Sequence, residues 1–210
     1  MSLEGKNRKV FSYKNADRSN ANFMYKIFDK AECYKSVFNN SNFDGASFRA
    51  TKLKYCSFSN STFIGSEFIG TNLRGSQFNG SHFENAIFNG VVLDKTSFKD
   101  CSFFHSIFVS VDIEKIGVII NDTCNIISSG DKGLEVPEEL IKCAKELISN
   151  STCRKSVIQL KEKKINVITL KMLLYDFTVD ELIDRLPKAV VEAPKNCTVS
   201  YLRKMLKKMS

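Results

Sequence analysis

The sequence predicts a solenoid of short extended segments over about residues 11–120, followed by a small all-α domain. Three observations predict this arrangement. A large apolar residue returns at every fifth position, and a small residue stands two positions before it. Every fourth large residue differs from the other three, which adds a period of twenty. After about residue 120 this register ends, and apolar residues recur at the spacing of helices instead.

The five-residue register runs through nineteen consecutive units, from Phe23 to Ile113, without an insertion. Fourteen of the 17 phenylalanines occupy its large position. Because alternate residues of an extended backbone point to opposite sides, the small and the large residue share one side and the residue between them faces the other. Eight large residues are expected to form the structural core: Phe63, Phe68, Leu73, Phe78, Phe83, Phe88, Leu93 and Phe98.

The last residue of each unit indicates a turn. Glycine and asparagine are the residues that most easily adopt positive φ in tight turns. They occupy this position in nine units: Asn40, Gly45, Asn60, Gly65, Gly70, Gly75, Gly80, Asn85 and Gly90. An extended segment followed by a tight turn, repeated, makes a coil with corners.

The triplets SNF, ASF, TKL, CSF, STF, SEF, TNL, SQF, SHF and TSF resemble the signature of the pentapeptide-repeat family, A(D/N)LXX. The resemblance covers about residues 11–120. It implies that four units make one square coil and that about five coils stack into a right-handed quadrilateral β-helix. Lys26 at a small position and Cys33 at a large position depart from the pattern near its start, where an atypical capping coil is expected.

The twenty-residue period supports four-sided coils from the residues alone. One series of large residues consists of Cys33, Leu53, Leu73, Leu93 and Ile113, whereas the other three series are almost entirely phenylalanine. One side of the solenoid is therefore built differently from the other three. Large side chains fill the interior, so function is expected on the outer faces or at the ends.

Several outward positions of the solenoid are apolar where polar residues would suffice. Six of them are candidate interaction residues: Ile64, Ile69, Ile87, Phe104, Ile107 and Val109. An exposed apolar cluster indicates a contact surface. Two interpretations are open: the C-terminal domain packs over these residues, or they bind a protein partner or a second copy of the chain in a homodimer.

The side that carries the leucines also carries a weak basic stripe. Its cations are Lys35, Lys52, Lys54, Arg74, Lys95 and Lys115, and its acidic residues are Glu32, Asp94, Asp112 and Glu114. This pattern fits a solvated face, and it also fits a surface that binds an acidic partner.

The C-terminal half divides into a linker or cap at 121–135, which contains Gly130 and Gly133, and a helical domain at 136–210 with about five helices. Pro137 suits the first turn of a helix. A second helix is expected around 153–164, and a third from Ile168 to Tyr175.

Two further helices follow in this domain. Thr178 and Glu181 form a capping box at the start of one, and Pro187 is expected just after its end. The last helix carries one apolar stripe, formed by Leu202, Met205, Leu206 and Met209. The stripe is expected to close the domain's own core; the alternatives are docking on a membrane surface or on a partner helix.

The composition is that of a folded protein, with 43% hydrophobic and 26% charged residues and a net charge of +8 that forms no concentrated basic block. The apolar runs are far shorter than the roughly 18 to 20 residues that a membrane span needs. The first ten residues lack the apolar segment of a secretory signal, so the expected location is cytoplasmic.

The sequence disfavours an enzyme. Seven cysteines form no C-x-x-C pair, and His82 and His105 have no acidic or thiol companion at ligand spacing. No Gly-rich phosphate loop and no histidine paired to a nucleophile is found. We therefore expect no metal, no cofactor and no catalytic residue, and reduced thiols.

The expected function is a non-catalytic scaffold or adaptor that binds a protein partner of unknown identity. The resemblance implies one alternative, protection of a type II topoisomerase such as DNA gyrase from quinolones or toxins by mimicry of DNA. Mimicry needs an acidic surface, whereas this solenoid is weakly basic. DNA binding by the helical half is a second alternative, which is disfavoured because Asp180, Glu181 and Asp184 would face phosphates.

Overall fold

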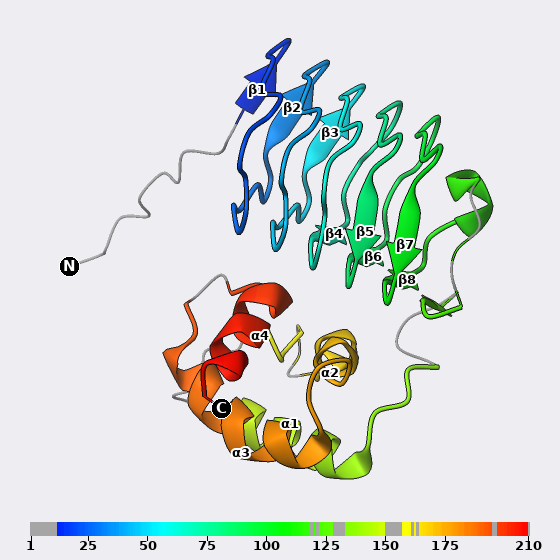
Figure 1. The fold of residues 1–210 in the computed structure, drawn as a ribbon. Coiled ribbons are helices and arrows are strands. Elements are labelled where there is room, and N and C mark those ends of the chain that lie inside the picture. Colours follow the sequence, from blue (N-terminus) through cyan, green and yellow to red (C-terminus); the bar gives the residue numbers. More distant parts are fainter. Residues whose placement is uncertain are drawn as a thin grey trace.

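The computed structural model describes residues 12–117, 120, 122–127, 133–149, 157–160, 162, 164–194 and 197–209. Residues 12–127 form a β-solenoid of about six turns, and four helices follow in the described part of the chain. Figure 1 shows the coils stacked in chain order with the helices gathered along one side of the stack. The predicted β-solenoid with a C-terminal helical region is therefore confirmed.

Three parallel sheets form three sides of the solenoid. The β1–β3 side consists of β1 (Ser12–Lys14), β2 (Glu32–Tyr34) and β3 (Lys52–Lys54). The β4–β9 side consists of β4 (Glu67–Ile69), β6 (Ile87–Asn89), β8 (Ile107–Val109) and β9 (Asn125–Ile127). The β5–β7 side holds β5 (His82–Glu84) and β7 (Ser102–Phe104). Isolated parallel bridges, such as Ser57 with Gln77, hold the fourth side.

The register of the strands carries the twenty-residue period of the sequence. Cys33 lies opposite Leu53 and Phe68 lies opposite Phe88 in neighbouring coils. After the 3₁₀ helix η1 (Ile113–Ile116), β9 pairs with β8 and places Ile126 opposite Phe108. The stack thus continues into the range 121–135, where the sequence predicts a linker or cap. This added strand is one reason for the sixth turn.

Stacked aromatic rings fill the interior. In three of the four large-residue series, each phenylalanine ring stacks on the ring one coil further along, for example Phe43 on Phe63 at 5.1 Å and Phe63 on Phe83 at 4.8 Å between centroids. The eight residues predicted to form the core are between 0% and 3% exposed. Each buried side chain contributes about 1.5–3 kcal/mol before entropy is subtracted.

The small position is mostly Ser or Thr because its hydroxyl joins neighbouring coils. Thr71 Oγ1 donates to the backbone oxygen of Phe48 at 2.6 Å. Ser61 Oγ donates to the oxygen of Phe38 at 3.1 Å and accepts from the nitrogen of Ser41 at 3.1 Å. The register therefore selects a side chain small enough to fit beside the phenylalanines and polar enough to pair buried backbone groups.

The turn position has positive φ in every unit from Asn15 to Ser110, although many of these residues are neither Gly nor Asn. Tyr25 and Tyr55 are examples, with φ of 57° and 56°. Each tyrosine ring lies over the turn of the next coil, where a Cβ on Gly45 or Gly75 would approach a ring carbon to 2.5 Å. Close packing against the tyrosine ring, rather than φ alone, therefore favours glycine at these two turns.

The helices of the described part are α1 (Glu138–Ser149), α2 (Val167–Leu173), α3 (Val179–Glu192) and α4 (Val199–Lys207). The helix expected at 153–164 is not formed in its described portion. Residues 157–158 form a turn, and Gln159 bridges antiparallel to Ile165. Residues 153–156, 161 and 163 of that prediction lie outside the described residues.

The capping box of α3 is present: Thr178 Oγ1 accepts from the Glu181 nitrogen, and Glu181 Oε2 accepts from the Thr178 nitrogen. The expectation that this helix ends before Pro187 is wrong, because Pro187 lies inside α3. Buried Leu186 and Val190 on either side of the proline anchor the helix in the core, and this packing outweighs the lost backbone hydrogen bond.

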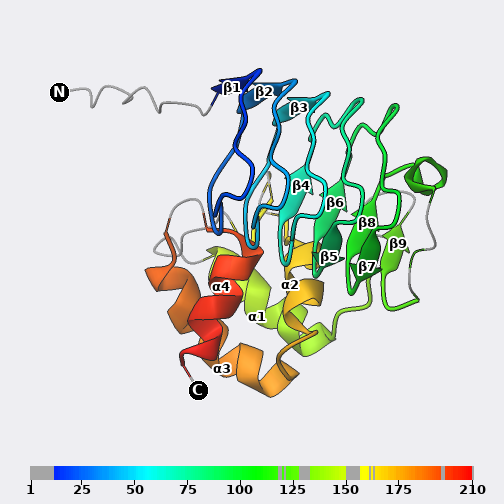
Figure 2. The same ribbon diagram turned by 45° about the horizontal axis from the view of Figure 1, so that its top comes forward.

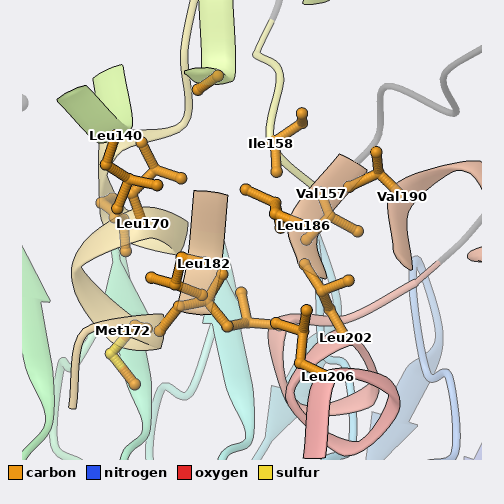
Figure 3. Packing of buried hydrophobic residues seen from close by; sticks show 14 of the residues in the cluster. Leu140, Val157, Ile158, Leu170, Met172, Leu182, Leu186, Val190, Leu202 and Leu206 are labelled. Carbon is orange, nitrogen blue, oxygen red and sulfur yellow. The ribbon is translucent and has the colours of Figure 1, made fainter. Parts of the chain in front are cut away.

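The helices pack against the β4–β9 side. Figure 2 shows α4 and α2 next to the solenoid and α3 further away, as Figure 1 does. One apolar cluster joins the two halves, since it contains solenoid residues and residues of all four helices. Figure 3 shows part of it, including Leu140, Leu170, Leu182 and Leu206. Leu202 and Leu206 of the predicted stripe are buried there, with Met205 and Met209 packed against the cluster.

Candidate functional site

Four of the six candidate interaction residues lie between the two halves of the chain. Ile87, Ile107 and Val109 are buried in the cluster that the helices share, and partly buried Ile69 packs against it. This arrangement corresponds to the first of the two interpretations, in which the C-terminal domain covers the apolar positions. These side chains are therefore in contact with the chain's own helices.

A buried carboxylate fixes the start of α4 on the same side. Glu67 is 0% exposed, and its Oε1 accepts a hydrogen bond from the backbone nitrogen of Val199 at 2.6 Å. Its Oε2 lies 2.6 Å from a guanidinium nitrogen of Arg49. A carboxylate is favourable at the first turn of a helix, where backbone N–H groups lack partners. Sequence reasoning missed this role, because Val199 is 132 positions away.

The remaining two candidates, Ile64 and Phe104, are exposed on the β5–β7 side, at 38% and 39%. They belong to one column of outward residues, in which each member lies one coil from the next. The column is Met24, Asp44, Ile64, Glu84 and Phe104. It alternates apolar and acidic residues.

A groove of about 510 Å³ runs between this column and α4, and we call it the α4 groove. On the solenoid it is lined by Met24, Asp44, Ile64, Glu84 and the turn residues Tyr25, Gly45, Gly65 and Asn85. On the helical half it is lined by Asp176, Ser200, Arg203, Lys204, Lys207 and Lys208. Ile64 is the sequence-predicted residue that lies in it.

The helical wall of the groove is held by polar contacts. Ser200 Oγ donates to the backbone oxygen of Gly65 at 2.6 Å. Buried Arg203 forms an ion pair with Asp176, and Lys207 Nζ lies 3.3 Å from the other oxygen of that carboxylate. Lys204 Nζ lies 4.8 Å from the centroid of the Tyr25 ring. Two of the four cations in the wall therefore share the single carboxylate of Asp176.

The β1–β3 side carries the basic stripe that the sequence predicts. Lys14, Lys52, Lys54 and Tyr34 line a hollow of about 260 Å³ together with Cys33 and Glu32. Glu32 pairs with Lys52 at 2.7 Å, and the hydrogen bond from this lysine lowers the pKa of Glu32. At the opposite end, Lys115 pairs with Asp94 and Asp112. The surplus of positive charge thus lies over β1 to β3.

Three buried cysteines, Cys33, Cys56 and Cys197, and partly buried Cys101 are poor nucleophiles at neutral pH. Burial raises the pKa of Cys33 and Cys197 to about 12, and that of Cys56 and Cys101 to about 11. Within the described ranges, no group of three or more His, Cys, Asp or Glu residues is placed to hold a metal ion. None of the helices in the described part has the length and apolarity that crossing a bilayer requires.

Stacked coils with a filled interior define a repeat solenoid that presents only outer surfaces to a partner. A family model described as pentapeptide repeats matches residues 41–80 and 66–103, with eight copies. The repeats that this model matches lie in the solenoid, and the helical domain follows them. No curated protein sequence matches the chain significantly.

Among solved structures, the chain is similar to a pentapeptide repeat protein from the Arabidopsis thaliana thylakoid lumen, at 20% identity over 48% of this chain and 68% of that one, with a TM-score of 0.36. A trypsin-treated variant of QnrB1, a plasmid-mediated fluoroquinolone resistance protein, is 20% identical over 55% and 62%, with a TM-score of 0.32. HetL of Nostoc sp. strain PCC 7120, involved in heterocyst differentiation regulation, is 8% identical over 57% and 82%, with a TM-score of 0.18.

Proposed function

We propose that this protein is a non-catalytic interaction module that binds an acidic surface of a partner protein through its β1–β3 side. The observation that carries the proposal is the hollow of Lys14, Lys52 and Lys54 beside two exposed tyrosines. Tyr34 and Tyr55 lie edge to face there, 5.7 Å apart. Tyrosine combines a large contact area with a hydrogen-bonding group, and it is enriched at protein interfaces.

The arrangement of the chain supports this role. The helices cover the β4–β9 side through a shared core, so they hold the rest of the solenoid in a fixed relation to the helical half. The phenylalanine ladders leave no room inside the described coils for a substrate. A partner would therefore bind on the outer surface of the solenoid.

A topoisomerase-protecting role is not proposed. Replacement of DNA phosphates requires a continuous acidic surface, whereas cations predominate over β1 to β3. A supercoiling assay with gyrase and a quinolone tests this alternative directly. Protection by the purified protein would favour mimicry over our proposal.

The interaction proposal is tested by charge reversal. The double variant Lys14→Glu/Lys54→Glu removes two cations of the hollow, and Lys142→Glu/Lys145→Glu makes the same change in net charge on exposed residues of α1. We expect partners cross-linked to the full chain to be acidic at the contact. Their binding should be lost in Lys14→Glu/Lys54→Glu and kept in the control variant. It should also weaken steeply as the salt concentration rises. Equal binding by both variants, or no salt dependence, would overturn the proposal.

A further inference from the structure

Three cations in one column of the β1–β3 side have no acidic partner within the described chain. Lys14 and Lys54 belong to this column of outward residues, and Arg74 continues it one coil further. Among the residues that the structure describes, no carboxylate forms an ion pair with any of the three. Glu32 in the hollow pairs with Lys52 instead, at 2.7 Å. The three side chains are therefore available to acidic groups of a partner.

The column sets the spacing that the acidic groups of a partner should have. Lys14, Tyr34, Lys54 and Arg74 follow one another in neighbouring coils. At the usual strand spacing, the three cations lie at about 0, 10 and 14 Å along the stack. A helix laid along the stack presents residues i, i+7 and i+10 on one stripe at about 0, 10.5 and 15 Å. Because lysine stems are flexible, the spacing favours a helix but does not decide the matter alone.

Backbone hydrogen bonding decides between a helix and an extended segment. The backbone groups of this side pair between neighbouring coils: the Lys35 nitrogen donates to the Lys54 oxygen at 3.1 Å, and the Tyr55 nitrogen to the Arg74 oxygen at 3.0 Å. These bonds run along the stack, so the outer face presents side chains and no strand edge. An extended segment on this face could not join a ladder, whereas a helix brings its own backbone bonds.

Two exposed tyrosines supply contact area between the cations. Tyr34 lies in the column between Lys14 and Lys54, and the ring of Tyr55 lies 5.7 Å from it. Both side chains are about two-fifths exposed, at 40% and 43%. In a helix with acidic residues at i and i+7, a residue at i+3 or i+4 lies midway between them on the same stripe. An apolar residue there would meet the tyrosines.

The chain's own helices show that a side of this solenoid can receive helices. On the β4–β9 side, the outward residues Ile87, Ile107 and Val109 share one cluster with all four helices, and Glu67 accepts from the first N–H of α4. The β1–β3 side has the same parallel register between coils. It carries cations and tyrosines where the β4–β9 side is aliphatic, so a helix that fits it is acidic as well as apolar.

We propose that the partner segment bound by the β1–β3 side is an acidic amphipathic helix that lies along the stack. Two acidic residues seven positions apart pair with Lys14 and Lys54, and an apolar residue between them contacts Tyr34 and Tyr55. Arg74 extends the charged contact by one turn of the helix. This inference rests on the function proposed above and names the form of the partner.

The first test titrates the full chain with three synthetic peptides and follows the amide signals of β1 to β3 by nuclear magnetic resonance at low salt. The first peptide is an alanine-rich helix with two glutamates seven positions apart and a leucine four after the first. In the second, one glutamate is moved by two positions, onto the opposite side of the helix. In the third, two alanines between the glutamates are replaced by proline, which breaks the helix.

Affinity should fall about threefold for the second peptide, the loss of one exposed ion pair, and at least about tenfold for the third. Equal affinity of the first and third peptides would overturn the helical form and leave the acidic partner of the proposed function in place. No shift in β1 to β3 with any peptide would overturn the inference, and the charge-reversal experiment then judges the proposed function separately.

The second test measures the direction of the helix on the face. Lys14→Gln should weaken binding of the helical peptide about threefold, whereas Lys142→Gln, on exposed α1, should leave it unchanged. A spin label at one end of the peptide should broaden the amide signal of either Lys14 or Arg74 more than that of the other. Equal broadening of both signals would place the helix across the stack and contradict the proposal, as would equal effects of the two substitutions.

Discussion

Glu67 shows how one residue joins the two halves of the chain. Its carboxylate is buried, pairs with Arg49, whose side chain is 33% exposed, and accepts from the first backbone nitrogen of α4. Removal of the carboxylate leaves a half-buried cation and a buried N–H group without a partner. Each of these losses destabilises the folded state.

We therefore expect Glu67→Ala to lower the free energy of unfolding by about 3 kcal/mol. Glu32→Ala is the matched control, since its ion pair with Lys52 has side chains 51% and 60% exposed. An exposed pair contributes about 0–1 kcal/mol. Urea unfolding measures both, and similar losses would contradict the role of Glu67.

Gly65 tests the contact between a turn and α4. Gly65 and Gly70 have similar positive φ, 66° and 60°, but a Cβ on Gly65 would lie 2.0 Å from Ser200 Oγ, whereas a Cβ on Gly70 meets no atom within 4 Å. Gly65→Ala should thus cost about 1–3 kcal/mol more than Gly70→Ala. Thermal or urea unfolding of the two variants makes the comparison. Equal costs would mean that α4 does not pack on this turn.

The buried thiols predict a loss of stability in alkali. The pKa of Cys56 is raised from 9.0 to about 11 in the folded state by burial. Because the pKa is higher in the folded state, the protonated thiol stabilises the fold. This contribution to the free energy of unfolding is complete below about pH 9. It is lost as the pH rises toward 11, by up to about 1.4 kcal/mol per pH unit for each thiol. Cys56→Ser, which has the commonest residue of the small position, should show a shallower fall of unfolding free energy between pH 9 and 11. An unchanged slope would contradict this prediction.

At the scale of elements, the hydroxyl ladder can be separated from packing. Thr71 Oγ1 is bonded to the Phe48 oxygen, whereas Thr62 Oγ1 has no partner among the described residues. Both changes to valine keep the shape of the side chain. Thr71→Val should cost about 1–2 kcal/mol, and Thr62→Val should be neutral or slightly stabilising. Denaturant unfolding distinguishes them, and an equal effect would show that the ladder contributes nothing specific.

The elements also show what sequence can predict. The solenoid was predictable because every unit repeats the same local demands: a small polar residue, a large apolar residue and a turn. β9 was not, because it pairs after the five-residue register has ended. The length of α3 depended on packing around Pro187, and local propensity contains no information about that packing.

The candidate site was less accessible to sequence reasoning. Ile64 was found because it is apolar at an outward position. The other wall of the groove comes from α4, more than a hundred residues away. The position of α4 depends on its hydrogen bonds to Glu67 and to the backbone oxygen of Gly65. Asn85 was identified as a turn residue, but its unpaired oxygen is a property of the folded chain alone.

At the scale of the whole molecule, the two halves form one body. The cluster that contains Ile87, Ile107 and Val109 continues into all four helices, and contacts at both ends reinforce it. Glu67 and Gly65 accept hydrogen bonds from the start of α4, and Asn125 donates to the hydroxyl of Tyr175 further along the stack. A homodimer of this chain stays a prediction. Light scattering tests it by measuring the mass of the purified protein in solution.

Native-state hydrogen exchange at increasing urea, resolved by peptide, tests this central claim most directly. If the helices and the solenoid share one core, peptides from α4 and from β6 to β8 should open in the same transition, with the same free energy and the same dependence on urea. In Glu67→Ala the common transition should shift as a whole. Complete exchange of the helical peptides while the solenoid stays protected would contradict the account.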